Sequence, residues 1–159
     1  MKIPSLSLAI LFALQGILAA ADWSHYRGPE GDGSSPEPIR TDWAARSPRV
    51  VWKRAIDPAW SSVTVSGGKV FTQVNRRVGG QRRELCVALD TASGAELWSA
   101  DLDTASYPDG GTGSTDGPRS TPTVEGDRVY VLTSYLKLHC LRADTGAVVW
   151  SRDFLAEFP

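Results

Sequence analysis

The chain contains little cysteine and little histidine, with two of each among its 159 residues. Neither His25 nor His139 has a companion side chain at metal-ligand spacing, so we expect a structural role for both. The sequence also lacks an acid–base pair, a nucleophile triad, a phosphate-binding loop and a cluster of metal-ligating residues. It therefore predicts no catalytic residue and no metal site.

An excess of charge of either sign is also missing, because the formal net charge is −1 and the hydrophobic content is ordinary. A nucleic-acid-binding protein usually carries a basic excess, and a disordered chain usually has few apolar residues. Both classes are excluded by this composition. The length is that of one domain of normal size.

A long apolar span is absent too, since residues 6–18 form a run shorter than the roughly 20 residues that a membrane-spanning helix needs. This run follows Lys2 and is succeeded by three alanines that end at Ala21, which is the pattern of a secretory signal peptide. The sequence predicts cleavage near Ala21 and an exported, periplasmic or secreted, protein. An uncleaved signal anchor is the alternative, and a lipid anchor is not supported because no cysteine lies near the cleavage site.

An oxidising compartment permits a disulfide bond between Cys86 and Cys140. Superposing the two repeats described below places these cysteines at neighbouring strand positions that are not directly opposed. Because disulfide geometry is demanding, two buried free thiols are the preferred interpretation.

What the sequence does contain is a repeat. The stretch from residue 65 to Trp98 returns from residue 124 to Trp150, and Trp52 ends a third, partial copy. Several strands per repeat and a period of roughly 40–50 residues are typical of propeller blades. The predicted fold class is therefore all-β, a β-propeller of four-stranded antiparallel blades that follows a signal peptide.

About two complete blades are present, whereas a closed propeller needs about four to eight. We therefore expect an incomplete ring, and interpret the sequence as an N-terminal fragment that would be completed by further blades. The expected organisation is a signal peptide at 1–21, an irregular lead-in at 22–49 and propeller repeats at 50–159, comprising a partial blade at 50–56 and blades at 60–100 and 119–154. The expected strands are 50–52 in the partial blade, 60–65, 69–74, 85–90 and 95–100 in the first blade, and 119–124, 128–134, 138–142 and 147–151 in the second.

Glycine, proline and aspartate in the lead-in indicate turns, while Trp23, Tyr26 and Trp43 indicate that it packs along the first blade. Four aspartates make the loop 101–118 a possible calcium site, with a plain connection between blades as the preferred alternative. They are Asp101, Asp103, Asp109 and Asp116.

The middle hairpin of the first blade carries an arginine-rich extension around a Gly79–Gly80 turn. This turn would place Arg77 opposite Arg82 and Arg76 opposite Arg83, and directly opposed like charges are unfavourable. A solvated tip is the preferred interpretation, and a bound anion is the alternative.

The repeated residues have a mechanical explanation. Asp90 can hydrogen-bond its own turn and Gly94 can take a positive φ, and Thr145 with Gly146 forms the corresponding turn of the second copy. Four residues after each glycine stand Trp98 and Trp150, and an aromatic ring there can pack against the neighbouring blade. Cofactor stacking is the alternative, but it would require one such residue per protein rather than one per blade.

Residues 88–98, Ala-Leu-Asp-Thr-Ala-Ser-Gly-Ala-Glu-Leu-Trp, resemble the tryptophan-docking motif of quinoprotein (PQQ-like) propeller repeats. The second copy keeps Thr145, Gly146 and Trp150, but has Cys140 and Arg142 where the motif has Ala and Asp. Residues 26–33 and 117–124 are similar to exported bacterial PQQ-binding-like repeat proteins, which are described as BamB-like.

This resemblance implies a propeller more directly than it implies bound PQQ, which in the dehydrogenases lies on the axis with calcium and a catalytic aspartate. We expect a non-catalytic exported module that binds other proteins or further blades, with no nucleic acid as partner and contact with the membrane only through its export signal. The expected contact residues are Trp60 and Arg119, at the channel ends of the first strands. The alternative is the N-terminal fragment of a PQQ-dependent dehydrogenase.

Overall fold

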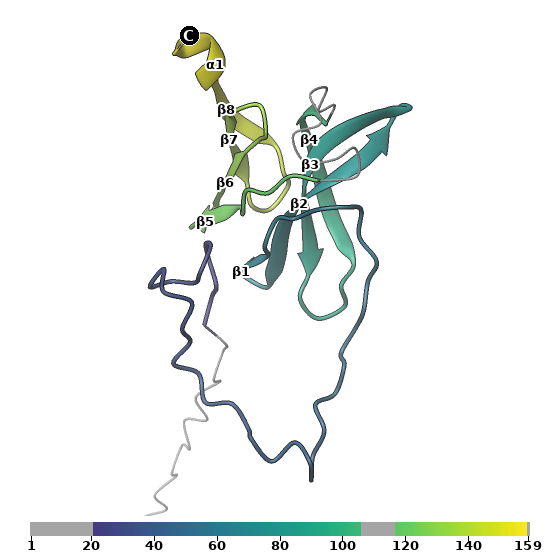
Figure 1. The fold of residues 1–159 in the computed structure, drawn as a ribbon, viewed down its shortest axis with the longest axis vertical. Coiled ribbons are helices and arrows are strands. Elements are labelled where there is room, and N and C mark those ends of the chain that lie inside the picture. The colour runs from purple at the N-terminus through teal and green to yellow at the C-terminus, as the bar shows by residue number, and fades with distance from the viewer. Residues whose placement is uncertain (1–20, 106–116, 159) are drawn as a thin grey trace, which may run out of the picture.

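The computed structural model describes residues 21–105 and 117–158, so the expected signal peptide and two of the loop aspartates, Asp109 and Asp116, lie outside the described residues. Within this part of the chain the strands form two four-stranded antiparallel sheets that stand side by side (Figure 1). The predicted fold class is confirmed, because the two sheets correspond to about two propeller blades in an unclosed ring.

Each sheet is a meander in which chain order and spatial order agree. The first sheet contains β1 (Thr64–Ser66), β2 (Lys69–Val78), β3 (Gln81–Asp90) and β4 (Glu96–Thr104). The second contains β5 (Thr123–Glu125), β6 (Arg128–Leu132), β7 (Lys137–Arg142) and β8 (Val148–Asp153). A single helical turn, α1 (Phe154–Glu157), follows β8 and is capped by Asp153, whose Oδ1 accepts a hydrogen bond from the Ala156 amide at 3.1 Å.

Two glycine pairs set the register of the first sheet. Gly67 and Gly68 take φ values of 54° and 74°, and Gly79 and Gly80 take 57° and 84°, which is the positive-φ backbone that two-residue hairpin turns require. Side chains with a Cβ adopt this backbone less readily, so these glycines fix where β2 begins and ends.

The main hydrophobic core lies between the two sheets. Its members alternate along the strands, so that one face of each sheet is apolar. They are Phe71, Cys86, Ala88, Ala100, Leu102, Val124, Val129, Val131 and Leu141. Fully burying one such aliphatic side chain contributes about 1.5–3 kcal/mol, so this shared core is the principal attraction between the blades.

Both cysteines are free and buried. Cys86 belongs to the core between the sheets, where burial raises the pKa of its thiol. Cys140 pairs across β7 and β8 with Trp150, and Trp150 in turn lies against Tyr130. Cys86 and Cys140 therefore act as small apolar side chains, as the preferred interpretation expected.

Strand boundaries differ from the expected ones at the first strand of each sheet, which forms its inner edge. Residues 50–52, which are described, form no strand, and the first strands begin only at Thr64 and Thr123. Hydrogen bonds that involve side chains replace part of the expected backbone pairing between strands. The Gln73 backbone amide donates to Ser61 Oγ at 3.3 Å, and Thr72 Oγ1 donates to the Ser62 carbonyl at 3.2 Å. An edge strand is hydrogen-bonded on one side only, so its ladder is more easily interrupted.

The lead-in differs from the expectation that it packs along the first blade. Residues 30–51 swing away from the sheets in an open arc (Figure 1), and Tyr26 and Trp43 are mostly exposed. Its first residues, 22–24, which we term the strap, form hydrogen bonds with the first strand of each sheet. Trp23 exchanges two backbone hydrogen bonds with Val65 of β1, at 2.8 and 2.9 Å, and Val124 of β5 donates to the Ser24 carbonyl at 2.7 Å. The strap thus joins the two blades.

Candidate functional site

The repeated tryptophans occupy equivalent places in successive repeats. Trp52 lies over Gly94, where an added Cβ would come within 2.6 Å of the ring, and its Nε1 donates to the Thr91 carbonyl at 2.8 Å. Trp98 lies over Gly146 in the same way, with a 2.5 Å approach, and its Nε1 donates to the Ala143 carbonyl at 3.1 Å. A side chain at either glycine would displace the ring above it.

Trp150 is the third of these tryptophans, and it has a different environment. Its side chain is 41% exposed, and its ring centroid lies 6.1 Å from that of Tyr130 on the same sheet. Trp98 contacts the turn of the following repeat, whereas Trp150 lies on the open face of the second sheet.

The turns below these rings use different side chains in the two repeats. Asp90 Oδ1 accepts hydrogen bonds from the Ser93 hydroxyl at 2.6 Å and the Ser93 amide at 2.8 Å, and these bonds lower the pKa of Asp90. At the equivalent position, Arg142 instead pairs with Asp144 at 3.2 Å. The backbone bond that closes the turn is 2.8 Å in both, from Gly94 to the Asp90 carbonyl and from Gly146 to the Arg142 carbonyl. The turn therefore survives the loss of the aspartate.

The two expected contact residues lie together. The guanidinium of Arg119 lies over the Trp60 ring at 5.8 Å from its centroid, and the Trp60 amide donates to the Pro118 carbonyl at 3.0 Å. Each precedes the first strand of its sheet, so the pair spans the rim between the blades. Trp60 keeps 65% of its surface exposed. The arrangement offers an indole face and a cation at one place, which suits a polar–aromatic contact with another molecule.

A buried polar network, which the sequence did not predict, joins the two sheets at the end where Trp60 and Arg119 lie. Asp103 of β4 pairs with Lys137 of β7 at 3.1 Å and accepts a hydrogen bond from Thr133 at 3.1 Å. Glu84 of β3 is fully buried and accepts from the Ser134 amide at 3.0 Å. These carboxylates hold the blades together and are thereby engaged in structural contacts.

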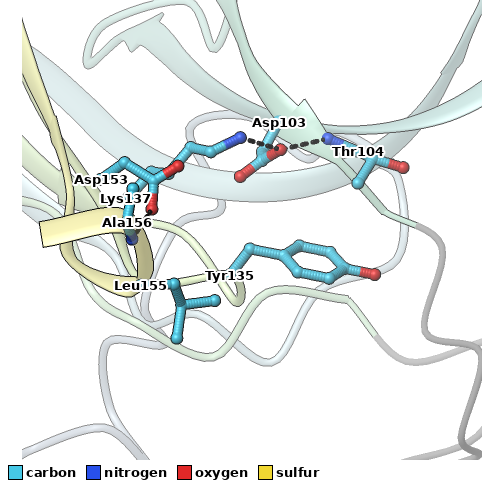
Figure 2. Close-up of a pocket in the computed structure, with 7 residues that line it drawn as sticks. All are labelled: Asp103, Thr104, Tyr135, Lys137, Asp153, Leu155 and Ala156. Atoms are coloured by element: carbon cyan, nitrogen blue, oxygen red, sulfur yellow. Dashed lines mark hydrogen bonds and ion pairs between the residues drawn. The ribbon is translucent and has the colours of Figure 1, made fainter. Parts of the chain in front are cut away.

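An open hollow of about 400 Å³ lies above this network, and Figure 2 shows Lys137 and Thr104 both donating to Asp103 on its wall. Its walls come from the ends of β4 and β8, from α1 and from the turn before β7. The lining residues are Asp103, Thr104, Tyr135, Lys137, Asp153, Leu155 and Ala156. Because its lining carboxylate Asp103 is already neutralised by Lys137, the hollow has no unpaired buried charge at that point.

His139 lies two residues from Lys137 on β7 and is 7% exposed. Within the described residues neither of its ring nitrogens has a hydrogen-bond partner. Burial lowers the pKa of His139, the negative charge of Asp103 opposes this change, and the positive charge of Lys137 adds to it. Burial therefore favours the neutral form of His139.

The register of the arginine-rich hairpin is the one expected, with Arg76 opposite Arg83 and Arg77 opposite Arg82. One pair is neutralised by distant acids. Arg76 binds Asp57 at 2.7 Å and Glu96 at 2.8 Å, and Arg83 binds Asp101 at 2.8 Å. These contacts raise the pKa of Arg76 and lower that of Glu96.

No group of three or more His, Cys, Asp or Glu side chains suited to a metal ion occurs in the described part of the chain. Asp101 and Asp103, two of the four aspartates considered for calcium, bind Arg83 and Lys137 respectively. Among the same residues, no helix is long and apolar enough to cross a membrane.

Comparison with known proteins agrees with this fold. Residues 81–158 match the family model described as outer membrane protein assembly factor BamB. A search of the curated proteins found no match.

Similar solved structures include BamB from Moraxella catarrhalis, with 25% identity over 56% of this chain and 22% of that one, and a TM-score of 0.39. A europium-containing methanol dehydrogenase has 21% identity over 57% of this chain and 14% of that one, with a TM-score of 0.43. Quinohemoprotein alcohol dehydrogenase ADHIIG from Pseudomonas putida HK5 has 21% identity over 64% of this chain and 14% of that one, with a TM-score of 0.44. The matched part is thus less than a quarter of each of these proteins. Residues 81–158 are thus similar to PQQ-like, BamB-like β-propeller repeats.

Proposed function

We propose that this chain is a non-catalytic, exported propeller module that binds another protein through the rim between its two blades. The observation that carries the proposal is the Trp60–Arg119 pair, in which a largely exposed indole is held against a guanidinium at 5.8 Å. Tryptophan and arginine are the residue types most enriched at the energetic centres of protein interfaces.

The buried carboxylates near this rim support a structural rather than a catalytic role. A general acid or base needs a free proton-transfer site within hydrogen-bond reach of a substrate. Glu84 accepts from a backbone amide of the second sheet, and Asp103 is bound by Lys137 and Thr133. Both acids are thus engaged in holding the blades together. Export is supported by the apolar run before Ala21 and by the family description, which names the outer membrane.

Site-directed photo-crosslinking in the exporting host tests the proposal, using the protein at its natural full length. A photo-crosslinking amino acid at Trp60 should yield a discrete adduct with one protein, and the same substitution at Trp43 in the lead-in should not. Trp43 is a matched control because it is also mostly exposed. It belongs to residues 30–51, the segment that forms an arc away from the sheets (Figure 1). Adducts that are absent, or equal at both positions, would contradict the rim as the binding surface.

The competing function is that of a PQQ-dependent dehydrogenase of which this chain is a fragment. It is tested on the purified full-length protein. PQQ and calcium ions are added, and the absorbance of bound quinone and the oxidation of an alcohol with an artificial electron acceptor are recorded. We expect neither signal. Quinone absorbance together with turnover would overturn the non-catalytic assignment, whatever the outcome of the crosslinking.

A further inference from the structure

We infer that the tip of the β2–β3 hairpin is a docking site for an acidic peptide segment of the partner protein. The arginine tip, as we term it, comprises residues 77–82, with Arg77 and Arg82 as its charged members. This inference rests on the proposed binding function and deepens it by naming the chemical class of the partner.

The arginine tip carries two positive charges on one face of the hairpin. Arg77 and Arg82 are direct cross-strand partners, so two guanidinium groups emerge side by side from one face of the hairpin. Arg77 donates to the Gly80 carbonyl at 3.0 Å and Arg82 to Asn75 Oδ1 at 3.4 Å. Among the described residues neither arginine forms an ion pair with a carboxylate, so both cations keep capacity for an anionic partner.

The opposite face of the same hairpin is balanced in charge. Successive side chains of a strand point to opposite faces, so Arg76 and Arg83 lie on the opposite face of the hairpin from Arg77 and Arg82. That face is neutralised by three carboxylates, those of Asp57, Glu96 and Asp101. The fold therefore balances one arginine pair internally and, among the described residues, gives the other pair no carboxylate partner.

The arginine tip lies beside the rim between the blades. Alternation along β3 puts Arg82 on the same face as Glu84, which accepts a hydrogen bond from Ser134 of the second sheet. The Asn75 amide, two residues before Arg77, donates to the Pro58 carbonyl at 2.9 Å, and Trp60 follows two residues later. The arginine tip and the Trp60–Arg119 pair thus border the same side of the first blade.

The surroundings favour a peptide carboxylate over other anions. A planar guanidinium matches a carboxylate in two parallel hydrogen bonds, and Val78, 42% exposed, and Trp60 add apolar surface that a peptide can cover. The Gly79–Gly80 turn has no side chains to obstruct a backbone that approaches the tip. A nucleic acid needs a broad basic face, whereas this chain has a net charge of −1.

The test measures the fluorescence anisotropy of a labelled hexaglutamate peptide with the full-length protein, at low and at physiological salt. The parent should bind the peptide and should bind it more weakly as salt rises. The double variant Arg77→Gln/Arg82→Gln should lose about tenfold or more in affinity, because two charge-assisted contacts are removed. Arg152→Gln is the matched control, since Arg152 is an exposed arginine that pairs with Glu157 on the second blade. It should bind as the parent does.

Folding is checked on the same variants by urea unfolding. The double variant should be at least as stable as the parent, because the substitution relieves repulsion between like charges. Equal peptide affinity in the double variant and the parent would overturn the inference, and so would an equal loss in Arg152→Gln. Displacement of the peptide by inorganic phosphate at a matched concentration of charge would also overturn it, in favour of a small-anion site.

These outcomes are separable from those of the proposed function. Quinone absorbance and turnover would refute the non-catalytic assignment while leaving the charge dependence of peptide binding intact. Loss of the crosslink at Trp60 with peptide binding retained would refute the rim and leave the arginine tip.

Discussion

At the scale of single residues, the tryptophan and glycine of each repeat form one unit split between neighbouring repeats. The Trp98 ring fills the space left by the missing side chain of Gly146, and its indole N–H satisfies the Ala143 carbonyl. The repeated motif was visible in the sequence because both residues recur at fixed spacing. The acceptor was not, because any residue type supplies a backbone carbonyl.

We therefore predict that Trp98→Ala lowers the free energy of unfolding by about 3–5 kcal/mol, as expected for a large packed aromatic side chain. Urea unfolding monitored by circular dichroism measures this change. Trp60→Ala serves as the control, because a side chain with 65% exposure should cost little when it is removed. A Trp98→Ala protein with the midpoint of its parent would refute the role of Trp98 as a fastener between blades.

At the scale of elements, turn chemistry and alternation predicted the eight strands of the two sheets but not where each strand ends, and the ninth expected strand, at 50–52, does not form. β2 and β3 extend to the Gly79–Gly80 turn, which requires Asp57, Glu96 and Asp101 to neutralise Arg76 and Arg83. Those acids lie far away in the chain, so local sequence carries no sign of them. The buried polar network of Asp103 and Glu84 was also missed. Both acids lie outside the strands expected from the sequence, and their partners lie far away in the chain.

His139, on the face of β7 that meets the first sheet, should make the free energy of unfolding depend on pH. Its folded-state pKa is below the usual value of about 6.5, so the folded state binds this proton less readily than the unfolded state. The resulting stability is fully present above pH about 6.5 and is lost as pH falls toward the lowered pKa.

Urea unfolding of the parent and of His139→Gln across this pH range measures the effect. The variant should show a smaller loss of stability on acidification, because the group that must be protonated is gone. Parallel slopes for the parent and His139→Gln would exclude His139 as the source.

At the scale of the whole molecule, one core serves both sheets. Phe71 and Ala88 of the first sheet pack in the same cluster as Val129 and Leu141 of the second. The sequence indicated two repeats of one fold class, and the shared core explains why neither is a separate domain. Two repeats do not predict how the ring of blades closes, because closure depends on the number of blades.

The shared core predicts that the two sheets unfold together. Leu141→Ala, at a fully buried position of the second sheet, should lower the free energy of unfolding by about 2–5 kcal/mol. Amide hydrogen exchange should then show equal losses of protection in the most stable amides of β3 and β7. Unchanged protection in β3 would mean that the first sheet is an independent folding unit.

The strap also bears on the order of folding. Trp23 and Ser24 are synthesised before nearly everything they bind, since their partners Val65 and Val124 emerge much later from the ribosome. Contacts between residues distant in sequence close large loops and form slowly. The strap is therefore among the last parts to settle, and its hydrogen bonds to β1 and β5 act as a latch on blades that have already paired.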